Sequence, residues 1–296
     1  MDVYPVYNEK ARGVEYLTMG EALKRDLLTV TEVSESGSVP ELKVVSRAEQ
    51  PVLIIAGEQL IGSKQDRVST TTILVPPKES LRIPVNCTEA GRWSYTSREF
   101  TEPNFVMSAK LREKKSDYVA QSLKNGRGFL GDQSAVWRDI EEVNKKAGAQ
   151  SPSDAMKAGF DAKRSDIDEY TAAFRKMRGQ KGVLVAIGGE VVGLEVFSTE
   201  HACRKFYPKI IRSYALDAIL SAEHGRAKSN RTAPQDFLAR ARFCNRDIYP
   251  SVGLGRDVRL SGGGLTGSAL EYQGELVYLA LFAGHRPDHR RREAAW

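Results

Sequence analysis

The first ninety residues alternate between short apolar runs and turn-forming residues, which is the pattern of β-strands. One short helix precedes the strands, because Thr18 and Glu21 have the spacing of a capping box directly before residues 22–26. Gly, Pro and Ser separate the apolar runs, and β-branched residues are frequent in them. The predicted strands are residues 27–33, 42–45, 52–61, 68–75 and 80–85.

Residues 105–180 follow a helical pattern instead. Trp137, Ile140 and Val143 have helical spacing behind Asp132, a good N-cap residue. Residues 166–177 form a second amphipathic pattern, which Gly179 would close. The apolar faces of these helices are too small for a separate core, so residues 105–180 are predicted to be a helical insertion that could act as a lid.

Strands return after residue 180. Residues 182–187 and 191–197 are predicted strands, and Thr199 would cap a helical stretch that Pro208 either interrupts or divides in two. A last helix is predicted for residues 234–243, followed by strands at 256–260, 268–272 and 276–282. The second half of the chain is therefore also rich in strands.

A Gly-Glu pair stands between two apolar runs at three places, residues 57–58, 189–190 and 274–275. Glycine tolerates the positive φ that tight hairpins need, so each pair is predicted to be a turn between antiparallel strands. Parallel neighbours would need crossovers of a dozen or more residues. The predicted fold is one α+β domain, residues 1–284, with an antiparallel β-rich core and the helical insertion at 105–180.

Composition agrees with a globular protein in the cytoplasm. The 296 residues are 41% hydrophobic and 28% charged, and no apolar run approaches the roughly 20 residues of a membrane helix. Residues 1–5 do not have the pattern of a signal peptide. The three cysteines have no CxxC spacing, so neither a disulfide framework nor a metal site is predicted.

Residues 285–296 supply +2 of the net charge of +6, and this basic segment without periodicity is predicted to be disordered. Such a tail attracts any polyanion without specificity. The charge alone therefore gives little reason to expect nucleic-acid binding.

The first candidate cluster is Lys64, Gln65, Asp66 and Arg67. Alternation along a strand would put Gln65 and Arg67 on one face. A Gln amide and an Arg fork together can orient an anionic or amide-bearing ligand. The alternative is a solvated edge strand that its charges protect from aggregation.

The second cluster spans residues 87–93. Glu89 could act as a general base or accept a ribose hydroxyl, Arg92 could bind phosphate, and Trp93 could stack on a ring. A local Glu89–Arg92 salt bridge that closes a turn explains the same residues without a ligand. Cys87 has no histidine nearby in the sequence to activate it, so a buried thiol is the preferred interpretation.

The two clusters are predicted to meet. Residues 76–79 are too short for anything but a reversal between strands 68–75 and 80–85. Antiparallel pairing would bring Gln65 and Arg67 towards Cys87 and Glu89. The sequence thus predicts one site at one end of a hairpin, with Trp93 at its rim.

These motifs resemble the family of ARG and rhodanese-phosphatase-superfamily-associated proteins. The resemblance rests on Gly57-Glu58, Gly62-x-Lys64-Gln65-x-Arg67 and Pro84-Val-x-Cys87-x-Glu89-x-x-Arg92-Trp93. Asp66 stands where the family pattern would have Asn. Because the family is named for its association with ADP-ribosylglycohydrolases, the resemblance implies a role with NAD- or ADP-ribose-derived molecules.

The functional hypothesis is a protein that handles ADP-ribose- or NAD-derived nucleotides, with hydrolysis as one form of that role. Glu89 and Glu58 are the candidate catalytic residues; Lys64, Gln65, Arg67, Arg92 and Trp93 are the candidate ligand-binding residues. The alternative is a non-catalytic binding or scaffold module that recognises a partner protein or a modified side chain. The sequence assigns neither a cofactor nor an oligomeric state.

Overall fold

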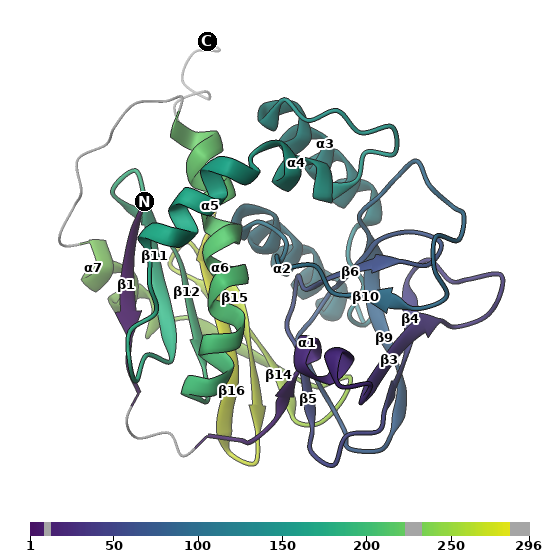
Figure 1. The fold of residues 1–296 in the computed structure, drawn as a ribbon. Coiled ribbons are helices and arrows are strands. Elements are labelled where there is room, and N and C mark those ends of the chain that lie inside the picture. Colours follow the sequence, from purple (N-terminus) through teal and green to yellow (C-terminus); the bar gives the residue numbers. More distant parts are fainter. Residues whose placement is uncertain (9–12, 223–232, 285–296) are drawn as a thin grey trace, which may run out of the picture.

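Three β-sheets and seven helices form the part of the chain that the computed structural model describes, residues 1–8, 13–222 and 233–284. Figure 1 shows the seven-stranded sheet on the left, the six-stranded sheet on the right and α2 (Ala109–Lys124) near the centre. The fold is α+β with a β-rich core, as predicted. The basic segment 285–296 lies outside the described residues.

The largest sheet has seven strands, and every neighbouring pair is antiparallel. Two of the predicted Gly-Glu hairpins are confirmed here. Gly188 and Gly189 turn with φ of 62° and 86°, and Gln273 and Gly274 with φ of 53° and 80°. Two consecutive positive φ angles are typical of the hairpin turn that matches strand twist. In spatial order the strands are β1 (Asp2–Val6), β11 (Gly182–Ile187), β12 (Glu190–Phe197), β16 (Glu275–Ala283), β15 (Leu265–Tyr272), β14 (Arg256–Gly262) and β13 (Asn245–Pro250).

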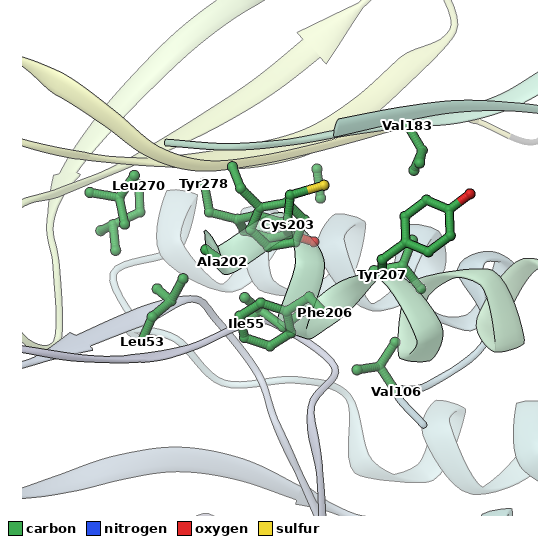
Figure 2. Packing of buried hydrophobic residues seen from close by; sticks show 14 of the residues in the cluster. Leu53, Ile55, Val106, Val183, Ala202, Cys203, Phe206, Tyr207, Leu270 and Tyr278 are labelled. Atoms are coloured by element: carbon green, nitrogen blue, oxygen red, sulfur yellow. The ribbon is translucent and has the colours of Figure 1, made fainter. Parts of the chain in front are cut away.

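Both faces of this sheet are covered. Val183 and Val185 belong to the core under α6 (Glu200–Ser221), whereas Leu184 belongs to the core that contains Phe237 of α7 (Ala233–Ala241). Figure 2 shows Val183 and Tyr278 of the sheet beside Phe206 and Tyr207 of α6. Because alternate side chains enter different cores, β11 is apolar throughout rather than alternating.

The six-stranded sheet is also antiparallel and consists of β10 (Phe100–Thr101), β6 (Gln59–Gly62), β7 (Arg67–Ser69), β9 (Ser80–Cys87), β4 (Glu41–Ser46) and β3 (Leu28–Glu32). A small sheet consists of β2 (Leu17–Thr18), β5 (Val52–Ile54) and β8 (Ile73–Val75), in which β2 and β5 pair in parallel. Each of the predicted strands 52–61 and 68–75 is therefore two strands that belong to different sheets.

The prediction of a hairpin at Gly57-Glu58 is wrong. Both sides of β5 are occupied by β2 and β8, so the chain passes at Gly57 from the small sheet to the six-stranded one. Gly57 has a φ of 87°, and an added Cβ would lie 2.5 Å from the Arg112 side chain. The predicted strand 68–75 is likewise interrupted at residues 70–72. There the Thr70 hydroxyl donates to the Phe129 carbonyl at 2.8 Å, and the Thr71 hydroxyl donates to Asp257 at 2.6 Å.

Four of the helices lie within residues 105–180, where the helical pattern predicted them. Leu111, Val136 and Ile140 from this region share a core with Val68 of β7 and Leu216 of α6. Most residues of this core come from the helical region itself, and Val68 and Leu216 connect it to the six-stranded sheet and to α6. The helices are α1 (Met19–Lys24), α2 (Ala109–Lys124), α3 (Gln133–Ala147), α4 (Met156–Ala162), α5 (Arg164–Ala173), α6 (Glu200–Ser221) and α7 (Ala233–Ala241).

The predicted caps of Thr18, Asp132 and Thr199 are confirmed, since each side chain accepts a backbone N–H of the first turn. The predicted break of α6 at Pro208 is wrong. Pro208 costs the helix a hydrogen bond, but Phe206, Ile210 and neighbouring side chains are buried on either side of it and hold both halves. In the described ranges, no helix has the length and apolar character that crossing a bilayer requires.

Candidate functional site

Strands β7 and β9 bring the two polar clusters together, as predicted. Arg67 stands directly opposite Cys87 in the antiparallel ladder, and the Thr88 N–H donates to the Asp66 carbonyl at 2.9 Å. The Gln65 side-chain amide also donates to the Glu89 carbonyl. The pairing differs from the prediction in one respect: only the first half of 68–75 lies beside β9, because β8 pairs with β5.

Arg92 is the centre of a hydrogen-bonded network. Its guanidinium donates to Glu89 Oε2 at 2.8 Å, to Asp66 Oδ1 at 3.1 Å and to the Ser63 carbonyl at 2.8 Å. Ser153, in the loop between α3 and α4, donates to Glu89 Oε1 at 2.7 Å. The network thus joins the β6–β7 loop, the segment after β9 and the helical region, and it occupies both Glu89 oxygens.

The two carboxyl groups of this network have opposite pKa shifts. Burial raises the pKa of Glu89, but the hydrogen bonds from Arg92 and Ser153 outweigh it and hold the pKa below its ordinary value. Burial raises the pKa of Asp66 above its ordinary value, and the nearby Glu89 charge adds to the rise. Near neutral pH, Glu89 is therefore a carboxylate that is already bonded.

Arg67 is fully buried and incompletely paired. Its Nη1 donates to the Gln65 carbonyl at 3.1 Å and to Gln65 Oε1 at 2.9 Å. Its Nη2 lies 3.8 Å from Glu32 Oε1. Within the described residues, Arg67 Nε and Nη2 and both Glu32 oxygens have no hydrogen-bond partner.

Unpaired polar atoms inside a protein are costly and uncommon. Burying a charged group without hydrogen bonds costs several kcal/mol, and more than nine in ten buried polar groups have a partner. Here a buried cation and a buried anion face each other, and both keep bonding capacity. A ligand that brings an acceptor to Arg67 and a hydroxyl to Glu32 would satisfy both.

Aromatic rings and a second cation border this pair. Trp93 is 47% exposed, its ring centroid lies 5.4 Å from Arg67 Cζ, and Lys64 Nζ lies 5.6 Å from it. We call Glu32, Lys64, Arg67 and Trp93 the Arg67 cluster. An exposed ring beside two cations can stack on a planar ligand group while both cations attract a negative one.

The loop at residues 33–40 covers the Arg67 cluster. An added Cβ on Gly37, whose φ is 78°, would stand 3.2 Å from Lys64, 3.3 Å from Trp93 and 3.5 Å from Glu32 Oε2. Among the residues that the structure describes, two side-chain hydrogen bonds reach this loop from the side of the cluster. Lys64 donates to the Ser36 carbonyl at 2.8 Å, and Tyr95 donates to the Glu35 carbonyl at 3.1 Å.

Glu58 lies in a different environment from the other candidates. Its Oε1 accepts from Lys209 of α6 at 2.8 Å, and its Oε2 accepts from the Ile55 N–H at 3.0 Å. Lys209 also pairs with Glu102, next to β10. Glu58 is completely buried, and its bonds join α6 to the turn between β5 and β6.

Cys87 is a buried thiol, which was the preferred interpretation of the sequence. Burial raises its pKa to about 11, although the Arg67 charge acts in the opposite direction. The thiol therefore stays protonated near neutral pH and is a poor nucleophile.

Glu32 is the member of the cluster that the sequence analysis did not identify. It stands two and four residues after Val30 and Leu28, which are buried on the same face of β3. An acidic residue that continues an alternating apolar face is unusual, and this was the available signal. In the described part of the chain, no three His, Cys, Asp or Glu side chains are grouped as metal ligands.

The comparisons with known proteins agree with the resemblance in the motifs. The family model of the ARG and Rhodanese-Phosphatase-superfamily-associated Protein domain matches residues 1–282, and the chain belongs to this family. The match covers all three sheets and the Arg67 cluster. Comparisons with curated proteins and with solved structures found no match.

Proposed function

We propose that this protein binds ADP-ribose- or NAD-derived nucleotides in the cytoplasm, at the Arg67 cluster. The observation that carries the proposal is the buried Arg67 guanidinium with two unpaired nitrogens directly beneath the exposed Trp93 ring. A guanidinium with free nitrogens binds phosphate oxygens in pairs. The association with ADP-ribosylglycohydrolases that the resemblance implies favours a nucleotide over other anions.

Each part of such a ligand has a matching group in the cluster. A phosphate accepts from Nε and Nη2 of Arg67, and Lys64 adds a second positive charge beside Trp93. The Glu32 oxygens accept ribose hydroxyls. Trp93 stacks on the base, an interaction that contributes about 1–3 kcal/mol per base in nucleic-acid complexes.

Entry of the ligand requires a displacement of the loop at residues 33–40. Arg67 is completely buried, whereas Trp93 and Lys64 are accessible to solvent. The ligand first meets Trp93 and Lys64, and it reaches Arg67 when the hydrogen bonds to Ser36 and Glu35 break. These are two bonds near the surface, so the cost of opening is small compared with the unfolding of a strand.

The geometry supports binding better than hydrolysis. A general base works best with a pKa near the working pH and a free oxygen within reach of water. Glu89 has a lowered pKa, and its two oxygens accept from Arg92, Ser153 and the Asp66 N–H. This favours the non-catalytic form of the hypothesis, in which the cluster recognises a free nucleotide or a side chain that carries one.

A thermal-shift screen with product analysis tests the class of ligand. The full chain is melted with ADP-ribose, NAD, AMP, pyrophosphate and inorganic phosphate, and each mixture is then analysed by chromatography. A ligand at a hundredfold excess over its Kd stabilises the fold by about 2.7 kcal/mol. We expect a shift with ADP-ribose and no new product; equal melting temperatures with every ligand would contradict the proposal.

A further inference from the structure

A second polar site lies in the interior, between α2 and the β15–β16 hairpin. A cavity of about 10 Å³ is lined there by Thr70, Arg112, Lys115, Ser116, Arg259 and Phe282, among other residues. This is the volume through which the centre of a water-sized sphere can move, so the cavity has room for one small particle. The cavity belongs to neither polar cluster of the candidate site and was not predicted from the sequence.

Three cations line this cavity, and two of them have carboxylate partners. Arg112 donates to Glu195 Oε1 at 2.8 Å, and Arg259 donates to Asp257 Oδ1 at 2.6 Å. The Lys115 ammonium donates instead to the backbone carbonyls of Ser69 and Thr70, at 2.5 and 3.3 Å. No ion pair within 4.0 Å joins Lys115 to any carboxylate of residues 1–8, 13–222 or 233–284.

Two further donors at the cavity are unpaired. Arg112 is 2% exposed and Ser116 is 8% exposed; neither Arg112 Nη1 nor Ser116 Oγ has a hydrogen-bond partner in the described structure. Both residues line the cavity. Residues that carry an unpaired guanidinium nitrogen, an unpaired hydroxyl and an ammonium group therefore line one small space.

The charge balance of this space is positive by one when Lys115 is protonated. Burial lowers the pKa of Lys115 well below its ordinary value, and the charges of Arg112 and Arg259 lower it further. Two forms of the site are consistent with this lowered pKa: a neutral Lys115 amine beside a water molecule, or a charged Lys115 ammonium beside an anion. The unpaired Arg112 nitrogen favours the second form, because an anion satisfies it more strongly than water does.

We propose that this cavity binds one small inorganic anion of the size of chloride, held by Lys115, Arg112 Nη1 and Ser116 Oγ. The anion balances the third cation and holds α2 to residues 69–70 at the end of β7, whose carbonyls Lys115 already contacts. This site is independent of the nucleotide proposal. It is a structural anion site that stabilises the packing of α2 against the end of β7.

Bromide locates such an anion directly. Crystals of the full chain grown in sodium bromide are measured at the bromine absorption edge. We expect one anomalous peak within hydrogen-bond distance of Lys115 Nζ and Arg112 Nη1. A well-ordered cavity with no anomalous peak, or with water alone, would overturn the proposal.

Melting in two salts gives a second readout. At equal ionic strength, sodium chloride should raise the Tm by on the order of 2 °C over sodium gluconate, whose anion is too large to enter. Lys115→Met should remove this difference, whereas Lys110→Met, on an exposed part of the same helix, should keep it. An equal Tm in the two salts for the unchanged chain would contradict the proposal, even if Lys115→Met does not fold.

Discussion

Arg67 Nη2 and Glu32 Oε1 lie 3.8 Å apart on the buried face of the six-stranded sheet, too far for a hydrogen bond and too close to be independent charges. Glu32 follows Leu28 and Val30 on the buried face of β3, and Arg67 stands opposite Leu60 of the neighbouring strand β6. The pair therefore keeps unused bonding capacity in the interior of the protein. This arrangement is the physical basis of the proposed nucleotide site.

Glu32→Gln tests which part of the ligand Glu32 meets. Because the carboxylate would accept ribose hydroxyls, the variant should bind ADP-ribose about tenfold more weakly and should bind pyrophosphate as before. Isothermal titration calorimetry with both ligands measures this ratio. Glu41→Gln is the matched control, because Glu41 lies on the neighbouring strand β4 and forms an exposed ion pair with Arg82 of β9. Equal losses for both ligands would rule out a ribose contact.

Arg92→Lys should act on stability. A lysine cannot bond to Glu89, Asp66 and the Ser63 carbonyl at once, so the free energy of unfolding should fall by about 2 kcal/mol. Urea denaturation measures the change, and ADP-ribose binding to the folded fraction should stay unchanged. Normal stability together with lost binding would instead support the ligand-binding role that the sequence predicted for Arg92.

Glu89→Gln should change the acid limb of the stability curve. Since the pKa of Glu89 is lower in the folded chain than its ordinary 4.5, the unfolded chain binds more protons and stability is lost as the pH falls below about 4.5. The variant should have a flatter slope there. Asp66, whose pKa is raised on folding, changes the pH dependence of stability in the opposite direction. The slopes of the variant and of the unchanged chain are therefore compared, rather than the midpoints of their curves. Identical slopes would show that Glu89 does not titrate differently on folding.

Gly57→Ala should lower the free energy of unfolding by about 2 kcal/mol, because it adds a left-handed strain and a contact with Arg112. Gly126→Ala is the control: its φ is 68°, and an added Cβ would meet nothing within 4 Å. Strain alone should cost the control about 1 kcal/mol. If the free energy of unfolding in urea falls equally for the two variants, the contact with Arg112 does not contribute to the loss of stability.

Local patterns predicted most of the fold. The capping box at Thr18 and the turns at Gly189 and Gly274 depend on residues within a few positions of each other, so the sequence contains the whole signal. The division of residues 52–61 between two sheets could not be predicted in this way. It depends on β2 and β8 occupying both sides of β5, and on Arg112 standing against Gly57.

The candidate site was predictable in part for the same reason. The short reversal after β8 placed Arg67 near Cys87, and the ladder confirms that proximity. Glu32 comes from a strand more distant in the sequence, and its burial depends on how β3, β4 and β9 assemble. Nothing in the sequence distinguishes Lys115 from the other lysines of residues 105–180, since only the packing of α2 on β15 and β16 buries it.

The binding of ADP-ribose to Arg67→Gln tests the central claim most directly. Calorimetry compares the unchanged chain, Arg67→Gln and Arg82→Gln, an exposed arginine on β9, at equal concentrations of folded protein. Loss of the charged hydrogen bonds should weaken binding to Arg67→Gln by about 10- to 100-fold, while Arg82→Gln binds as the unchanged chain does. Wild-type affinity in a folded Arg67→Gln variant would contradict the account.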